Sequence, residues 1–221
     1  TLVQLWVDQS TATLQLSDPE HFNSFATGLG ADMRRAVEHV STLHGVSSLV
    51  LQGAGPHFSV GGNPYTMRGS HVMSPAAVAL SLLELYDGFL KLRTLLHPVV
   101  GAVHGTLVGG GVAGSLHVDY LVADYVSTFE HGNLVRGVCV LGMLSQTFTR
   151  ALGPHAHHVY LQNARLDATP PPAINQKGKH CRDVDKAPAL LDHHIKDGAE
   201  RVVDECRERD DTLLTLATLP H

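Results

Sequence analysis

The sequence has little of what marks a membrane protein, a disulfide-stabilised protein or a nucleic-acid-binding protein. No apolar run is long enough to cross a membrane, since even the stretch 76–85 is interrupted by Ser81 and Glu84. The three cysteines are far apart and unevenly spaced, which predicts neither a disulfide framework nor a zinc site. Acidic residues outnumber basic residues 21 to 16, so the chain has no basic excess to attract nucleic acid. We therefore expect no membrane and no nucleic-acid partner.

Two further classes are disfavoured, namely secreted proteins and metalloproteins. The sequence opens on a strand-like pattern without a signal-peptide core, so we expect a reducing compartment, the cytoplasm. Histidine is abundant, but the only dense group is His155, His157 and His158. Because no second set of ligands follows at a recognisable spacing, we interpret that group as a solvated turn or helix start and expect no metal.

The pattern of apolar residues predicts an α/β protein. A chain of 221 residues can form one full α/β core but leaves little room for two. Predicted strands alternate with predicted helices along the chain, which favours right-handed βαβ units and a mostly parallel sheet. The expected strands are 2–7, 11–16, 48–51, 99–103, 120–123 and 127–129. The expected helices are one from Ser24 that ends at Gly45, 75–92, one from about 112, 144–152, 158–163 and 199–209.

Two places share one arrangement, in which a buried strand runs into a glycine cluster and then into a helix. The strand 49–51 leads to Val60-Gly61-Gly62, and the strand 99–103 leads to 109–111, three glycines in a row. Glycine lets the backbone approach a ligand closely and present its N–H groups. Two such turns facing each other would form an oxyanion hole for a carbonyl that becomes an enolate. Each cluster alone could also be a simple tight turn, and neither has the lysine of a phosphate-binding loop.

Together with their surroundings, these clusters resemble the crotonase (enoyl-CoA hydratase/isomerase) superfamily from about residue 2 to residue 168. The resemblance implies a crotonase-type ββα spiral with mostly parallel sheets and surrounding helices. The segments that carry it are Phe22-Asn23-Ser24-Phe25, Leu49 to Gly55, Phe58-Ser59-Val60-Gly61-Gly62, Pro98 to Gly105, Leu107 to Gly111, Asp119 and Ser127-Thr128-Phe129.

The resemblance also implies a site and a substrate class. The oxyanion donors would be the backbone N–H groups of Val60 and Gly110. The substrate would be an acyl thioester of coenzyme A or of an acyl carrier protein, whose phosphopantetheine belongs to the substrate, so no separate cofactor is expected. The assembly would be a homotrimer or another homo-oligomer. The region 1–168 would form the core, and 169–221 a helical segment that is shortened or rearranged.

The departures from the family pattern change the expected reaction. Hydratases of this family use two glutamates, at positions that here correspond to Ala113 and Asn133. Neither an alanine nor an amide can activate water or deliver a proton. We therefore expect a decarboxylase or a double-bond isomerase. The sequence is also similar to the decarboxylating crotonase-like enzymes of polyketide β-branching, although their characteristic lysine has no match here and Arg68 is the nearest cation.

Three polar residues are candidates for catalysis. His131 is the preferred proton donor because histidine titrates near neutrality, with a surface role as the alternative. Asn133 is expected to orient the substrate or cap a turn. Tyr65 would donate a proton or hydrogen bond, or only line the pocket. Cys139 and His104 are instead interpreted as structural.

Two rival hypotheses remain open at this point. In the first, the protein is a hydratase or dehydratase with a displaced acid, for which Glu130 and Asp124 are the candidates. In the second, the protein is a non-catalytic crotonase homologue that only binds an acyl thioester. A carboxylate within reach of the acyl group would favour the first, and a pocket filled by side chains would favour the second.

Overall fold

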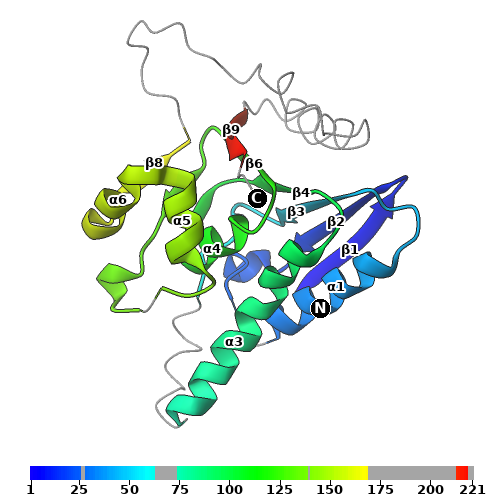
Figure 1. Ribbon diagram of the computed structural model, residues 1–221, viewed down its shortest axis with the longest axis horizontal. Coiled ribbons are helices and arrows are strands. Elements are labelled where there is room, and N and C mark those ends of the chain that lie inside the picture. Colours follow the sequence, from blue (N-terminus) through cyan, green and yellow to red (C-terminus); the bar gives the residue numbers. More distant parts are fainter. Residues whose placement is uncertain (26–27, 63–73, 139, 169–212, 219–221) are drawn as a thin grey trace, which may run out of the picture.

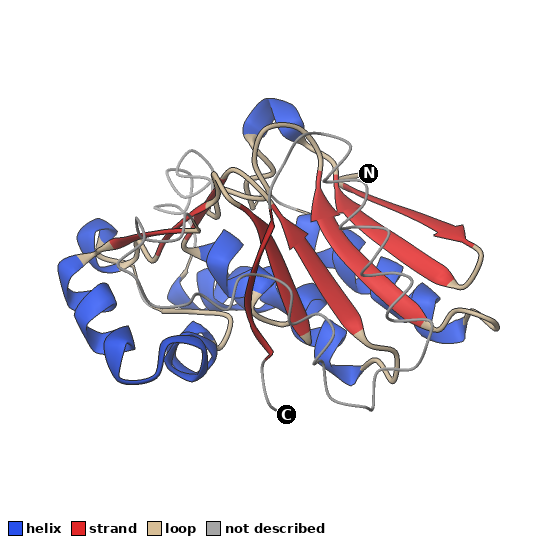
Figure 2. Cartoon of the chain, turned by 90° about the horizontal axis from the view of Figure 1, so that it is seen from above, coloured by secondary structure: helices blue, strands red, loops and turns tan. Residues whose placement is uncertain are grey.

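The fold consists of two sheets and the helices that flank them (Figure 1). The computed structural model describes residues 1–25, 28–62, 74–138, 140–168 and 213–218, and the description below concerns these ranges. Strands of the larger sheet fan across the molecule with helices behind them, and the smaller sheet lies at the end opposite the hairpin of β1 (Val3–Asp8) and β2 (Thr11–Leu16) (Figure 2).

The larger sheet has six strands in the order β1-β2-β3-β4-β6-β9. The pairs β2–β3, β3–β4 and β4–β6 are parallel, whereas β1 and β9 pair antiparallel at the two edges. The sheet is therefore parallel at its centre, as the alternation of strands and helices predicts. Its strands are β1 (Val3–Asp8), β2 (Thr11–Leu16), β3 (Ser48–Gly53), β4 (Val99–Val103), β6 (Tyr120–Asp124) and β9 (Leu213–Thr218).

The smaller sheet has the order β5-β7-β8, with β5–β7 parallel and β7–β8 antiparallel. Helices α5 and α6 lie on its side of the molecule (Figure 1). The strands of this sheet are β5 (Thr106–Val108), β7 (Thr128–Glu130) and β8 (Arg165–Asp167).

The α-helices of the described part are α1 (Leu29–Thr42), α3 (Pro75–Lys91), α4 (Gly110–Ser115), α5 (Leu144–Leu152) and α6 (Ala156–Gln162). Short 3-10 turns lie at Pro19–His21, Leu92–Thr94, Leu134–Arg136 and Gly153–His155.

The core forms where the main sheet meets α1. Alternate residues of β2 are buried, including Leu14 and Leu16, because successive side chains of a strand point to opposite faces. On α1 the residues Met33, Val37 and Val40 recur at helical spacing and are buried. The apolar stripe of the helix therefore covers the apolar face of the sheet, and the hydrophobic effect holds the two layers together.

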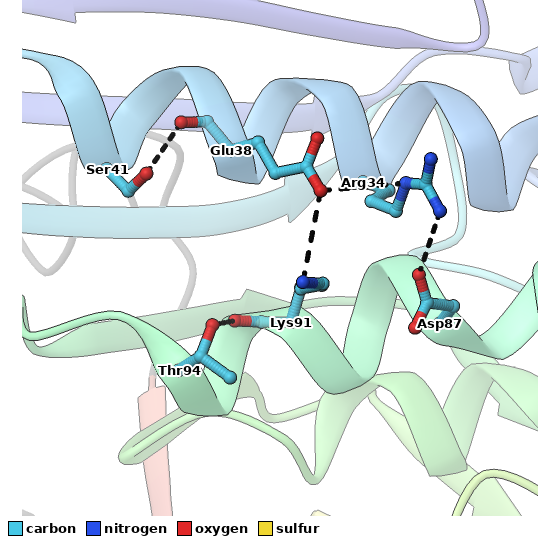
Figure 3. Close-up of polar contacts among 6 residues, drawn as sticks. All are labelled: Arg34, Glu38, Ser41, Asp87, Lys91 and Thr94. Atoms are coloured by element: carbon cyan, nitrogen blue, oxygen red, sulfur yellow. Dashed lines mark hydrogen bonds and ion pairs between the residues drawn. The ribbon is translucent and has the colours of Figure 1, made fainter.

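Helices α1 and α3 cross at close range through two glycines. A Cβ added at Gly88 would lie 2.5 Å from the carbonyl oxygen of Gly30, so the backbones are almost in contact. Figure 3 shows exposed ion pairs beside this crossing, where Arg34 lies 3.5 Å from Asp87 and Lys91 lies 3.9 Å from Glu38. Exposed pairs contribute little, about 0–1 kcal/mol each, so the glycine contact determines the geometry of this crossing.

The sequence predictions and the structure agree for most elements. The α/β class and the mostly parallel main sheet are confirmed, and α5 has the predicted bounds. The first helix begins at Leu29 rather than near Phe25, and β5, β8 and β9 were not predicted. The predicted helix at 199–209 lies outside the described residues, as does most of the segment 169–221, so the boundary at 168 stays a prediction.

Candidate functional site

The two glycine turns lie directly against each other. A Cβ added at Gly61 would be 2.1 Å from the carbonyl oxygen of Val108 and 2.9 Å from the nitrogen of Gly110. A Cβ at Gly111 would be 2.0 Å from the carbonyl oxygen of Ser59. A side chain at either position would collide with backbone, and Gly61 also has a positive φ of 78°. Glycine is therefore required for the two turns to meet.

Gly110 presents a backbone N–H that has no acceptor in the part of the chain that the structure describes. It is the first residue of α4, and the N–H groups of a first helical turn have no acceptor within the helix. None of the hydrogen bonds among the described residues is donated by this N–H. The position predicted from the triple glycine is thus geometrically able to donate to a ligand.

Val60 is not the most available donor of the first turn, because its N–H donates to the carbonyl oxygen of Phe22 at 3.2 Å, and its role as an oxyanion donor stays a prediction. The next N–H, of Gly61, donates to Ser59 Oγ at 3.2 Å. Gly62 follows, and its N–H has no acceptor within the part of the chain that the structure describes. No described atom lies within 4 Å of a Cβ built at Gly62, so the space beside it is open on that side. Gly62 therefore replaces Val60 as the candidate donor.

Asn23 holds the first turn in place. Its Nδ2 donates to the carbonyl oxygens of Ala54 and His57, both at 2.8 Å, and its Oδ1 accepts from the N–H of Asp18 at 2.8 Å. Its own carbonyl accepts from Ser59 Oγ at 2.8 Å. A single buried amide thus ties the loop before the turn to the turn itself.

Ala113 and Asn133 occupy positions around the triple glycine. Ala113 is buried on α4, one helical turn beyond Gly109, whose carbonyl accepts from the Ala113 N–H at 2.9 Å. Asn133 is buried, and its Oδ1 is 3.2 Å from a Cβ built at Gly109. The structure therefore brings Asn133 to the second glycine turn as a neutral, hydrogen-bonding group.

His131 is buried in an aromatic cluster. Its ring is buried and makes edge-on contacts with Phe148 and Tyr160, at centroid distances of 5.1 and 4.7 Å. Burial lowers the pKa of the ring. A lowered pKa disfavours the protonated ring, which weakens the case for His131 as the proton donor, and that role stays a prediction. Its Nδ1 is buried and has no hydrogen-bond partner among the described residues.

Glu130 is unsuited to the role of a displaced acid. Burial alone would raise the pKa of its carboxyl, but hydrogen bonds from Arg136 and Asn163, at 3.1 and 3.2 Å, outweigh burial and lower the pKa. The carboxylate therefore stays ionised in a network at the surface. The other candidate acid, Asp124, accepts from the N–H of Val126 at 3.3 Å.

Several predicted residues lie outside the described part. These are Tyr65, Arg68 and Cys139, and their roles stay predictions. His104 is held by a contact between its Nε2 and the carbonyl oxygen of Gly55 at 2.7 Å, which agrees with a structural role. Among the residues that the structure describes, no cluster of three or more His, Cys, Asp or Glu could hold a metal ion. No described helix is long and apolar enough to span a membrane.

Tyr86 is a neighbour of the site that the sequence did not reveal. It belongs to α3, more than twenty residues before the triple glycine, and its hydroxyl is 3.1 Å from a Cβ built at Gly110. Its ring packs edge-on against Phe25, with centroids 5.7 Å apart. Helical spacing alone gives no signal for this contact, because it depends on how α3 crosses the glycine turn.

A buried histidine connects the end of α4 to the loop before α5. His117 is 3% exposed, its Nε2–H donates to the carbonyl oxygen of Gly142 at 2.9 Å, and its Nδ1 has no partner among the described residues. Burial lowers the pKa of this ring to about 4, although the bond to Gly142 acts in the opposite direction. The His117 ring is therefore protonated near pH 6.5 in the unfolded chain but stays neutral to a lower pH in the folded protein.

This difference predicts a loss of stability in acid. Between pH 6.5 and 4 the unfolded state binds more protons at His117 than the folded state, so the free energy of unfolding falls as the pH falls, by on the order of 3 kcal/mol from this group. His117→Gln keeps an N–H donor for Gly142 but does not titrate. Urea unfolding of both proteins at pH 7, 5.5 and 4.5 should show a smaller pH dependence in the variant. An equal pH dependence would exclude His117 as its source.

Comparison with known proteins places the chain in a family. The family model for enoyl-CoA hydratase/isomerase matches residues 7–169. The chain is 30% identical over 152 residues to the probable enoyl-CoA hydratase EchA14 of Mycobacterium tuberculosis, covering 69% of this chain and 58% of that protein. It is 29% identical over 125 residues to the 1,2-epoxyphenylacetyl-CoA isomerase of Escherichia coli, covering 56% of this chain and 47% of that one.

A solved structure agrees with these relatives. An enoyl-CoA hydratase from Polaromonas sp. JS666 has a TM-score of 0.71 at 26% identity, over 75% of this chain and 65% of that chain. The chain thus spans about half to two thirds of the length of the relatives named here. The crotonase fold is confirmed. Because the family model covers most of the sequence, and the two glycine turns meet as the motifs predict, this chain belongs to the enoyl-CoA hydratase/isomerase family.

Proposed function

We propose that this protein stabilises the enolate of an acyl thioester and that its reaction is the decarboxylation of a carboxylated acyl group. The observation that carries the proposal is a pair of glycine N–H groups, of Gly62 and Gly110, that have no acceptor among the described residues and lie beside an alanine and an amide instead of two carboxylates. The site retains groups that stabilise negative charge on oxygen but lacks the acid and base of hydration at these two positions.

Decarboxylation matches this set of groups because it needs no base. The bond between the carboxylate carbon and the acyl chain breaks, its electron pair moves toward the thioester carbonyl, and CO₂ leaves. The negative charge that develops on the carbonyl oxygen is the charge that two backbone N–H donors stabilise. Asn133, whose Oδ1 lies beside Gly109, would help to position the acyl group as a polar side chain that does not titrate. A proton taken up at carbon completes the reaction.

Double-bond isomerisation is the second candidate, because the matching family includes enoyl-CoA isomerases. It uses the same enolate but requires a group that removes a proton from carbon. Hydration is disfavoured, since it needs a carboxylate that activates water. The segment 63–73, which follows the first turn, contains no Asp or Glu, and Glu130 is held ionised by Arg136.

A panel of substrates tests the proposal. The protein is incubated with malonyl-, glutaconyl-, methylglutaconyl- and crotonyl-thioesters of coenzyme A and of pantetheine, and the products are weighed by mass spectrometry. We expect loss of CO₂ from one of the carboxylated thioesters, above the rate in buffer alone. Addition of water to the crotonyl group would overturn the proposal in favour of a hydratase, and binding without any reaction would favour a non-catalytic role.

The same panel tests which carrier holds the acyl group. The ratio of kcat/KM for the coenzyme A thioester to kcat/KM for the pantetheine thioester measures how much the nucleotide contributes to binding. A substrate presented on an acyl carrier protein would be the alternative. Assembly as a homotrimer and a cytoplasmic location stay predictions, and light scattering of the purified protein tests the first of them.

A further inference from the structure

The Tyr86 hydroxyl and the Gly110 N–H are close enough to share one acceptor. The hydroxyl is 3.1 Å from a Cβ built at Gly110, and a Cβ is two bonds, about 2.5 Å, from its own nitrogen. The two donors are therefore within about 6 Å of each other. Since each hydrogen bond spans roughly 2.7–3.2 Å, one oxygen between them can accept from both.

The ring of Tyr86 is held from two sides. Phe25 contacts it edge-on at a centroid distance of 5.7 Å and is itself stacked on Phe89 at 5.0 Å. On another side lies Gly142, where an added Cβ would be 2.5 Å from the Tyr86 ring. The carbonyl of Gly142 is fixed by His117 Nε2 at 2.9 Å. A tyrosine packed in this way points its hydroxyl in one direction without an entropic cost on binding.

The hydroxyl is also chemically available. It makes no hydrogen bond to any residue in the part that the structure describes, and the side chain is not completely buried. Burial raises the pKa of the phenol to about 12, so it keeps its proton throughout the neutral range and acts as a donor. A partly buried hydroxyl without a protein partner loses free energy unless a ligand or water accepts from it.

We infer that Tyr86 is a third hydrogen-bond donor to the thioester carbonyl, acting beside the backbone N–H groups of Gly62 and Gly110. The inference rests on the proposed function, because it names a further catalytic residue of the same site. A side-chain donor compensates for the missing carboxylates in one respect only: it lowers the energy of the enolate without needing an acid or a base. Its bond strengthens as charge accumulates on the oxygen, so it stabilises the transition state more than the ground state.

The test compares Tyr86→Phe with Tyr120→Phe. The first change removes one oxygen and keeps the ring that packs on Phe25. The second removes the same oxygen from a partly exposed tyrosine of β6, which packs against Val100 and Val122 on the sheet. Both variants are expected to unfold thermally like the parent. Turnover should fall by about 10²-fold in kcat for Tyr86→Phe, with little change in KM, and stay at the parent value for Tyr120→Phe.

A spectroscopic measurement separates this inference from the proposed function. A cinnamoyl-type coenzyme A thioester, which carries no removable carboxylate, absorbs at longer wavelength when donors polarise its carbonyl. We expect a red shift on binding to the parent, a smaller shift with Tyr86→Phe at equal occupancy, and the parent shift with Tyr120→Phe. If the parent and Tyr86→Phe give equal shifts, Tyr86 is not a donor, although the proposed function stands. If the parent itself gives no shift, both are overturned.

Discussion

Replacing Gly110 with valine is expected to reduce kcat/KM for a thioester substrate by about 10²–10³-fold, the usual loss when one oxyanion donor is removed. The first added carbon would lie 2.8 Å from Phe25 Cε2 and 3.1 Å from the Tyr86 hydroxyl, both too close for a normal contact. The branched side chain would therefore displace Phe25 and Tyr86 and distort the place where the carbonyl oxygen of the substrate meets the N–H. Steady-state kinetics on the best substrate of the panel measures the effect.

The control must distinguish a blocked site from a damaged fold. Gly137 is exposed, has a φ of 62°, and has no described atom within 4 Å of an added Cβ. Gly137→Asn is therefore tolerated, because asparagine adopts this left-handed conformation more readily than other residues. Gly110→Ala, with a single added carbon, should give an intermediate loss. Parent-like turnover by a folded Gly110→Val protein would contradict the assignment of this N–H.

Parts of the site that depend on backbone chemistry could be predicted from the sequence. Gly61 and Gly111 stand at positions where backbone meets backbone, and only glycine meets that requirement, so the pattern of glycines predicted the contact between the turns. The helix 144–152 was also predicted with its observed bounds, because Gly142 and Gly153 frame a clear helical repeat.

Two features of the site cannot be read from the sequence: the hydrogen-bond partner of each backbone group, and the direction in which each loop side chain points. Which N–H of the first turn is free depends on Phe22, whose carbonyl takes the N–H of Val60, and this bond links residues 38 positions apart. His131 and Asn133 lie two residues apart in one loop, yet one packs into an aromatic cluster and the other faces Gly109. The sequence predicts that both residues lie in this loop, but not where each side chain points. Side chains alternate in direction along a strand, and a loop need not follow that alternation.

The strand β9 illustrates the same limit for the fold. Its residues, Leu213–Thr218, pair antiparallel with β6, almost ninety residues earlier in the chain. A short run of leucine and threonine is compatible with helix or strand, and only the unpaired edge of β6 decides between them. Such pairing is a tertiary contact, which local propensity cannot supply.

The largest effect on stability is expected at Asn23. This side chain is 2% exposed, has a φ of 52°, and makes three hydrogen bonds to backbone groups of Asp18, Ala54 and His57. Asn23→Ala would leave those three groups without their partner, at about 1–3 kcal/mol for each that stays buried, and would place alanine in a left-handed conformation. We expect the free energy of unfolding to fall by roughly 3–5 kcal/mol, a large share of the 5–15 kcal/mol typical of a domain.

A second left-handed asparagine provides the matched control. Asn163 has a φ of 47° and two side-chain hydrogen bonds, from the N–H of Gly132 and to Glu130, but it is only partly buried. Because water can replace those partners, Asn163→Ala should cost about 1–2 kcal/mol. Urea unfolding followed by circular dichroism compares the two variants with the parent. Asn23→Ala should also lose turnover well below its unfolding midpoint, since Ser59 Oγ, which donates to the Asn23 carbonyl, accepts the N–H of Gly61 in the first turn. Equal destabilisation by the two substitutions would mean that burial of the Asn23 bonds does not hold the turn.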